Sequence, residues 1–426
     1  MPTIKRLHAL EILDSRGRPT VQATCEFSDG TTSTASVPSG ASRGAAEALE
    51  LRDGDASRFR GLGCRKAVEN VKTVISKAVC GRALETQEEL DRLLLALDGT
   101  PNKSRIGANA ILAVSIAFAR THAAQLKRPL YQHFAAMSGA SGGSARQLPR
   151  MTINLFSGGK HAGGQVAIQD VLVIPAAAPT IAEGLAVTYA VYQAAAELGL
   201  KKYGARALTA DEGGLAPPFT HAQSMLDDAV AAIENAGLKP GRDVVIAVDV
   251  ASSHFFEDGR YHLDGDVLDG KGMVARLASW VQQYPIVSVE DGLAEEDWAH
   301  WPLLREAIGA RALVLGDDLL CTNSARIRQA IEKRAANALL LKVNQIGTLT
   351  EAAEAGKLAQ DAGWSVTISA RSGETEDDWL ADLAVGWSGT QIKVGSIAHS
   401  ERLAKYNRLL QIEEETKLPV AAWPGK

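Results

Sequence analysis

The chain has 426 residues and a formal net charge of −5 at pH 7. This length exceeds the usual size of one domain, so we expect two domains, and the weak negative charge gives no general attraction for nucleic acid or for an anionic membrane. No apolar stretch approaches the roughly 20 residues that span a bilayer, and the N-terminus lacks the apolar segment of a signal peptide, so we expect a cytoplasmic protein that acts on small molecules.

The N-terminal third predicts a small mixed domain. The runs IKRLHALEIL, TVQATCEF and TTSTASV alternate apolar and polar residues, which predicts an antiparallel three-stranded meander over residues 1 to about 37. Helical periodicity follows from Ala45 to about His133. The next segment, MSGASGGSARQLPR, is rich in Gly, Ser and Arg and has no periodicity. We therefore predict a first domain over 1–136, a linker over 137–150 and a second domain over 151–426.

Five short apolar runs in the second domain each end in a charged residue. The runs are VVIAVDV ending at Asp249, IVSVEDG at Glu290, ALVLGDDL at Asp317, ALLLKVNQ at Lys342 and QIKVGS at Lys393. Amphipathic helical patterns separate them, as in parallel strands crossed by helices, and a sixth run, SVTISARSGET, carries Arg371 and Ser372 at its end. Any one acid could simply cap the next helix. All five together favour a site at the C-terminal mouth of a barrel or doubly wound sheet.

The residue types at this mouth indicate metal chemistry. Three carboxylates without His or Cys are the ligands of a hard cation, and Mg²⁺ fits best. Two lysines beside them can supply a base and a fixed positive charge. The sequence therefore predicts a magnesium site with a lysine base.

Three glycine-rich segments are predicted to be loops. They are PSGASRG at 38–44, FSGGKHAGGQ at 156–165 and ADEGGLAPP at 210–218. None matches a P-loop or the dinucleotide fingerprint in its strand-to-helix setting, so nucleotide binding by these motifs has no support. Each loop is either a connector or a lid that closes on a substrate.

A long set of motifs carries a family resemblance. EILDSRGRPTV, VPSGASRGAAEALELRDGD, LDGTPNKSRIGANAILAVS, DEGGLAP, YPIVSVEDGL, GDDLLCTN, KVNQIGTLTE, RSGETED and ERLAKYNRLLQIEEE occur in order between Lys5 and about Glu415. Together they resemble enolase, the phosphopyruvate hydratase family. The resemblance implies an α/β fold: an N-terminal α+β capping domain and a modified (β/α)8 barrel. It also implies a dimer and a small substrate that carries both phosphate and carboxylate.

The resemblance also implies a role for each site residue. Mg²⁺ is expected at Asp249, Glu290 and Asp317, and a second Mg²⁺ partly at Ser39. Lys342 matches the base, Glu212 matches the general acid, and Lys393 adds a positive charge. The phosphate is expected near Arg371 and Ser372. The other expected site residues lie around the substrate and the general acid Glu212, a region called the acid side below. They are His161, Gln169, Asp170 and Ala370.

The chemistry sets conditions on two of these groups. A lysine is a base near neutral pH only if nearby cations disfavour its ammonium form. Glu212 must stay protonated to release hydroxide, which requires a pKa raised by burial or by a neighbouring acid such as Asp170 or Asp211. We therefore expect a raised pKa for Glu212.

Three departures from the family pattern lie on the acid side. The family reads S-H-R-S-G-E-T where this chain has residues 369–375, so Ala370 replaces a histidine. The family's N-G-G-E-H loop contains Lys160 before His161 here, and its I-Q-E ends in Asp170 after Gln169. We expect the loss at position 370 to leave nothing beside Glu212 to set its proton.

Three functions remain open. The first is an ordinary glycolytic enolase, which converts 2-phosphoglycerate to phosphoenolpyruvate and water. The second is a diverged enolase-like lyase resembling carboxyphosphonoenolpyruvate synthase of phosphonate and phosphinate biosynthesis, with a nucleotide-activated phosphonoformate as a substrate. The third is a non-catalytic binding protein on the same scaffold. The intact metal ligands and lysines argue against the third, and the clustering of the three departures favours the second.

Overall fold

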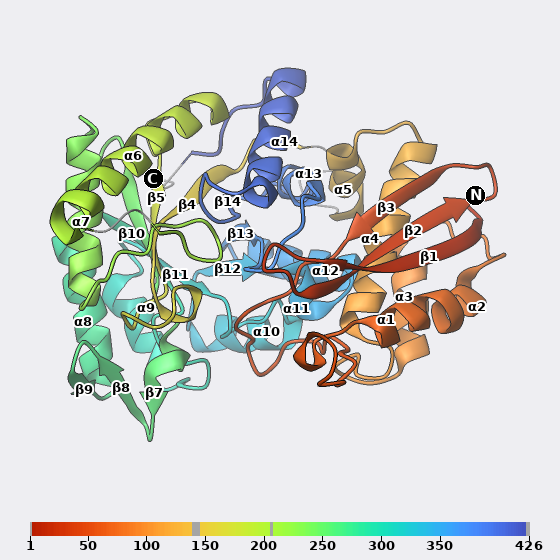
Figure 1. Cartoon of the computed structure of the whole chain (residues 1–426), viewed down its shortest axis with the longest axis horizontal. Helices are drawn as coiled ribbons and strands as arrows, with labels where there is room; N and C mark the ends of the chain where they lie inside the picture. Colours follow the sequence, from red (N-terminus) through yellow and green to blue (C-terminus); the bar gives the residue numbers. More distant parts are fainter. Residues whose placement is uncertain (1, 139–144, 205–207, 423–426) are drawn as a thin grey trace.

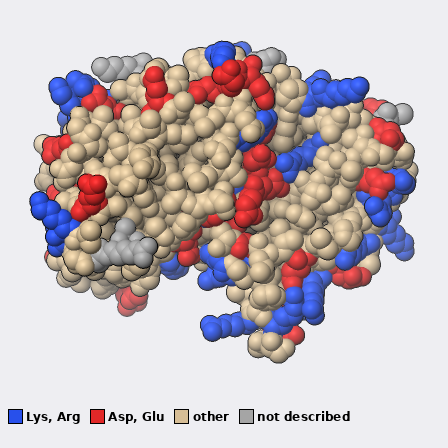
Figure 2. Space-filling view, turned by 45° about the horizontal axis from the view of Figure 1, so that its top comes forward, with Lys and Arg blue, Asp and Glu red and all other residues tan. Residues whose placement is uncertain are grey.

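The computed structural model describes residues 2–138, 145–204 and 208–422. Two parts are visible in Figure 1, with the three-stranded sheet and its helices on the right and a barrel on the left. Figure 2 shows acidic side chains gathered in a band between the two lobes on one face. Acidic groups thus line the junction of the two parts on this face, and other charged groups lie around its edges.

The N-terminal sheet is the predicted meander. Strands β1 (Ile4–Leu13), β2 (Pro19–Phe27) and β3 (Thr32–Ser36) pair antiparallel in that order. Helix α4 (Ala108–Gln125) is buried on nearly every side and packs on β2 and β3. Helices α1 (Arg65–Asn70), α2 (Ser76–Val79), α3 (Gln87–Asp98) and α5 (Leu130–Ser138) complete this part. This confirms the α+β character of the capping domain.

The expected helix from Ala45 was wrong for its first part. The first α-helix begins at Arg65, and the chain between β3 and this helix is a loop with turns and one short 3-10 helix (Phe59–Gly61). Its side chains form ion pairs instead of a helix face: Glu50 pairs with Arg52, and Glu47 pairs with Arg371 of the barrel. Tertiary contacts of this kind outweigh helix propensity, which is a weak preference.

The second part is a closed barrel of eight strands. Around the barrel the order is β10 (Ile286–Glu290), β11 (Leu313–Gly316), β12 (Ala338–Leu341), β13 (Ser365–Ser369), β14 (Gln391–Lys393), β4 (Arg150–Ser157), β5 (Asp170–Ile174) and β6 (Val245–Asp249). All six charged runs recognised in the sequence are strands of this barrel, which excludes the doubly wound alternative.

One strand of the barrel runs against the others. β5 pairs antiparallel with both β4 and β6, and Asp170 lies opposite Ser157 on one side and Asp249 on the other. The first residue of β5 therefore lies at the same end as the last residues of its neighbours. This reversal is what makes the barrel a modified one and brings Asp170 to the mouth.

Helices surround the barrel, and a small sheet projects from it. The helices are α6 (Ile181–Tyr203), α7 (Ala222–Asn235), α8 (Gly270–Gln283), α9 (Trp301–Ile308), α10 (Ser324–Lys333), α11 (Val343–Ile346), α12 (Leu349–Asp361), α13 (Trp379–Gly386) and α14 (Ser400–Thr416). The side sheet comprises β7 (Phe256–Glu257), β8 (Arg260–Leu263) and β9 (Asp266–Leu268). Within the described ranges, no helix combines the length and apolar character needed to cross a bilayer.

The predicted linker only partly falls within the described chain. Met137 and Ser138 belong to α5, and Arg150 begins β4. Residues 139–144 of the linker lie outside the described residues. The exact domain boundary therefore stays a prediction.

Candidate active site

The predicted charged residues meet at one end of the barrel. Asp249, Glu290 and Lys393 are the last residues of β6, β10 and β14, while Asp317 and Lys342 directly follow β11 and β12. The three carboxylates and Lys393 are buried. Strand ends position them because parallel strands bring their C-terminal ends to one rim.

Lys393 lies between two of the predicted metal ligands. Its Nζ is 2.9 Å from Asp249 Oδ2 and 2.7 Å from Glu290 Oε2. Burial lowers the pKa of this ammonium, but the charges of Asp249 and Glu290 outweigh burial and raise it well above its ordinary value. The two carboxylates therefore converge on a point that already accommodates a positive charge.

Asp317 has partners of its own. Its Oδ2 is 2.5 Å from Lys342 Nζ, and its Oδ1 accepts a hydrogen bond from Gln345 Nε2 at 2.7 Å. Burial lowers the pKa of Lys342, but the Asp317 and Glu290 charges give a net upward shift. The Asp317 carboxylate therefore favours the ammonium form of Lys342.

The donor set at this mouth fits a hard cation. Gln169 donates to Asp249 Oδ2 at 3.1 Å, whereas its own Oε1 is buried without a hydrogen-bond partner in the described chain. Carboxylates and a free amide oxygen are ligands that Mg²⁺ accepts.

Two other groups of ligating side chains are tighter than the predicted trio. Among the described residues, the ligand atoms lie within 4.8 Å of one another in the groups His161, Asp170 and Glu212, and Asp291, Asp317 and Asp318. Asp317 is the only member of the predicted trio in either group. The metal role of the trio stays a prediction.

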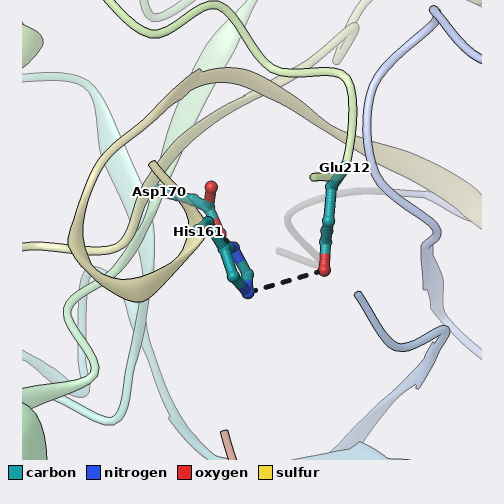
Figure 3. Close-up of side chains that lie close together, drawn as sticks. All are labelled: His161, Asp170 and Glu212. Carbon is teal, nitrogen blue, oxygen red and sulfur yellow. Dashed lines mark hydrogen bonds and ion pairs between the residues drawn. The ribbon is translucent and has the colours of Figure 1, made fainter. Parts of the chain in front are cut away.

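The acid side of the mouth is a cluster of buried groups joined by hydrogen bonds and one longer ion pair. His161 Nδ1 lies 3.0 Å from Asp170 Oδ2, and its Nε2 points at Glu212 Oε1, 3.7 Å away (Figure 3). Ser157 donates to Asp170 Oδ1 at 2.6 Å, and Asn154 Nδ2 donates to Glu212 Oε2 at 3.1 Å. The expectation that nothing lies beside Glu212 is therefore wrong, since His161 lies there.

The direction of the Glu212 shift also differs from the expectation. Burial raises the pKa of Glu212, but the charges of His161 and Arg402 outweigh burial, and the net shift is downward. Burial lowers the pKa of His161, whereas Asp170 and Glu212 raise it to about 9. The proton of this pair thus resides on the imidazole near neutral pH.

Arg371 and Ser372 follow β13 at the junction with the N-terminal part. Ser372 Oγ accepts hydrogen bonds from Arg16 Nη1 at 3.0 Å and from the Ala41 N–H at 2.8 Å. With both lone pairs engaged, the Ser372 hydroxyl has its hydrogen to donate. Arg402 fixes the backbone here, donating to the carbonyls of Arg371 at 2.7 Å and Ser372 at 2.6 Å.

Ala370 and Ser39 complete the predicted set. Ala370 is 6% exposed, and its N–H donates to the Lys393 carbonyl at 2.9 Å, so position 370 lies beside the lysine strand. Ser39 comes from the N-terminal part and pairs with Gly373 through two backbone hydrogen bonds. Ser39 Oγ is held by Glu50 at 2.9 Å and by Arg52 at 2.7 Å. The structure thus brings both domains to one mouth.

Sequence reasoning missed several polar residues of the site. They are Glu47, Asn154, Ser157, Asn344 and Gln345. Asn154 interrupts the apolar run MTINLF of a fully buried strand, a signal that could have found it because a buried amide needs partners. Asn344 and Gln345 belong to the short helix α11, which begins one residue after Lys342, so the same strand end brings them to the mouth.

Comparison with protein-family models agrees with this geometry. Residues 4–134 match the family described as enolase, N-terminal domain. Residues 145–425 match the family described as enolase, C-terminal TIM barrel domain. The two matches cover nearly the whole chain and correspond to the two parts of the fold, which also identifies the protein as an enolase-like lyase. The chain belongs to the enolase family.

Proposed function

We propose that this lyase removes the C2 proton of 2-phosphoglycerate or a close analogue with the help of Mg²⁺ and eliminates the hydroxyl to leave an enolpyruvate product. The observation that carries the proposal is that two groups of charged side chains face each other across the mouth of the barrel. Lys342 and Lys393 lie among carboxylates on one side, and the His161–Glu212 pair lies on the other. Proton removal and hydroxyl loss need groups of these two kinds.

On the lysine side, Lys342 is assigned as the base and Lys393 as a fixed positive charge near the substrate carboxylate. When bound by Asp249, Glu290 and Asp317, Mg²⁺ would neutralise the negative charge that builds on the substrate carboxylate. It would also neutralise the Asp317 carboxylate, which otherwise stabilises the ammonium form of Lys342. Lys342 Nζ then accepts the C2 proton. Gln169, held on Asp249, leaves its free oxygen for the ion or a substrate hydroxyl.

On the acid side, we assign the leaving proton to the His161–Glu212 pair. The pKa of His161 near 9 keeps its imidazolium charged at neutral pH, with Nε2 directed at Glu212. Glu212 can pass this proton to the departing hydroxyl while Asn154 holds its other oxygen. Asp170 orients the imidazole through Nδ1.

The altered residues favour a diverged substrate, and we propose carboxyphosphonoenolpyruvate formation in phosphonate or phosphinate biosynthesis. Three observations support it: the small Ala370 side chain beside the lysine strand, the added Lys160 cation and the shortened Asp170. A methyl group in place of an imidazole frees space for a larger phosphorus substituent, such as that of a nucleotide-activated phosphonoformate. Glycolytic enolase is the second candidate, favoured by His161 beside Glu212.

Turnover of 2-phosphoglycerate separates the two candidates. With a diverged substrate, the wild-type protein should form phosphoenolpyruvate weakly, and Ala370→His with Asp170→Glu should raise the rate by about 10²- to 10⁴-fold, the usual contribution of a positioned acid–base group. The control, Ala370→Leu with Asp170→Glu, fills the space without a nitrogen and should give no increase. A wild-type rate of about 10 to 10² per second in the absorbance assay would assign the protein to glycolysis.

A further inference from the structure

The guanidinium of Arg371 is already engaged by its own chain. Glu47 binds it with both oxygens, Oε2 at 2.9 Å from Nη1 and Oε1 at 3.1 Å from Nη2. Nη1 also donates to Asn344 Oδ1 at 3.1 Å, and Nη2 donates to the Ser42 carbonyl at 2.7 Å. An arginine has five N–H donors, so four are used and the Nε–H alone has no partner within the described chain.

This pair is buried and closely packed. The Arg371 and Glu47 side chains are 3% and 5% exposed. Glu47 Oε1 also accepts the Gly44 N–H at 3.1 Å, so the carboxylate fastens the loop 39–47 as well. A buried bidentate pair of a carboxylate with arginine is among the strong hydrogen-bonded contacts of proteins. An anion therefore cannot reach the paired Nη1 and Nη2 donors while Glu47 holds them.

We propose that Glu47 is a specificity-determining residue, because its carboxylate occupies the anion position at Nη1 and Nη2 of Arg371, and a phosphoryl or phosphonyl group that binds these two nitrogens must displace it. The inference rests on the proposed function and on the expectation, from the enolase resemblance, that the phosphorus group lies near Arg371. A substrate carboxylate has the same charge and the same two acceptor oxygens as the Glu47 carboxylate that already binds Arg371. A doubly charged phosphoryl group offers more charge and more acceptor oxygens. Glu47 thus allows the phosphorus group of the substrate, but not its carboxylate, to bind Arg371, and the carboxylate binds near Lys342 and Lys393 instead.

Calorimetric titration with inorganic phosphate tests this role. In Glu47→Gln the competing charge is lost while the side-chain shape is kept, so phosphate should bind about tenfold more tightly than to the wild type, within the range of typical coupling between sites. The matched control is Glu11→Gln, which alters another bidentate carboxylate–arginine pair, with Arg58, outside the site. Glu11→Gln should leave phosphate affinity unchanged.

The direction of the change in phosphate affinity shows whether Glu47 competes with phosphate for Arg371 or only holds Arg371 in place. If Glu47 only holds Arg371 in place, Glu47→Gln will bind phosphate equally or more weakly, and the inference is overturned. Arg371→Gln tests the proposed function separately: undiminished phosphate affinity there would refute the phosphate site itself. A loss in Arg371→Gln without a gain in Glu47→Gln would refute only the role of Glu47.

A measurement on the wild-type protein covers the case that Glu47→Gln does not fold. Displacement of Glu47 frees the Gly44 N–H, which Glu47 Oε1 now accepts. Hydrogen exchange at this amide should become faster when phosphate is added. Slower or unchanged exchange would contradict displacement.

Discussion

At the residue scale, the mouth of the barrel is a balance between buried carboxylates and two lysines. Lys393 compensates Asp249 and Glu290, and Lys342 compensates Asp317. Each of these charges would be costly to bury alone, because an unpaired charge loses its hydration. Any cation that binds these carboxylates must therefore balance the negative charge that the two lysines now balance.

This balance makes Glu290 the sharpest single position for testing the metal site. Glu290→Gln keeps the side-chain shape and leaves Lys393 its contact with Asp249, so the fold should survive. Because the variant lacks one ligand charge, Mg²⁺ affinity should fall by more than about tenfold in calorimetric titration. Glu88→Gln, on the exposed pair of α3 with Arg92, is the control and should bind Mg²⁺ like the wild type. Undiminished affinity in Glu290→Gln would remove Glu290 from the metal site.

The residue types of the site could be predicted from the sequence, but their protonation could not. A charge at the end of an apolar run is visible in one dimension, and this placed Asp249, Glu290, Lys342 and Lys393 correctly at the mouth. The pKa of Glu212 depends instead on His161 and Arg402, which approach it only in the folded chain. The expected direction was therefore wrong, although the burial that motivated it is real.

At the element scale, the loop 39–47 joins the two domains. Gly40 allows its closest approach, because a Cβ there would lie 1.9 Å from Arg371 Nη2. The sequence identified this segment as a glycine-rich loop, but continued the helical pattern from Ala45, where the ion pairs of Glu47 and Glu50 oppose it. Long-range pairs of this kind leave no periodic signal.

Gly40→Ala tests the packing of this loop on Arg371. The added methyl would lie 1.9 Å from Arg371 Nη2 and 2.7 Å from the Ser42 carbonyl oxygen, so the paired guanidinium and the backbone must both shift. We therefore expect stability to fall and phosphate affinity to fall severalfold. Gly199→Ala on α6 is the control, since a Cβ there meets only Pro217 at 3.8 Å. Thermal unfolding and calorimetry with inorganic phosphate measure the two effects. Unchanged affinity in Gly40→Ala would show that the close approach has no part in anion binding.

At the scale of the whole molecule, the site exists only where the two domains meet. The barrel supplies the carboxylates, lysines and Arg371, whereas the N-terminal part supplies Ser39, Glu47 and Arg16. Periodicity and strand-end charges predicted the N-terminal meander and a second domain of alternating strands and helices, but left a barrel and a doubly wound sheet open. The resemblance to enolase implied the barrel. The resemblance also implied that Ser39 of the N-terminal part reaches the site. Contacts such as Arg16 with Ser372 could not be predicted, because they join residues far apart in the sequence.

Exchange of the C2 proton of 2-phosphoglycerate with solvent deuterium tests the central claim most directly. In the presence of Mg²⁺ the wild-type protein should catalyse this exchange, and Glu212→Gln should still do so because it alters only the acid side. Lys342→Ala should abolish exchange, since no other base is assigned to the C2 proton. Nuclear magnetic resonance follows the loss of the C2 proton signal. Exchange that persists in Lys342→Ala would contradict the account.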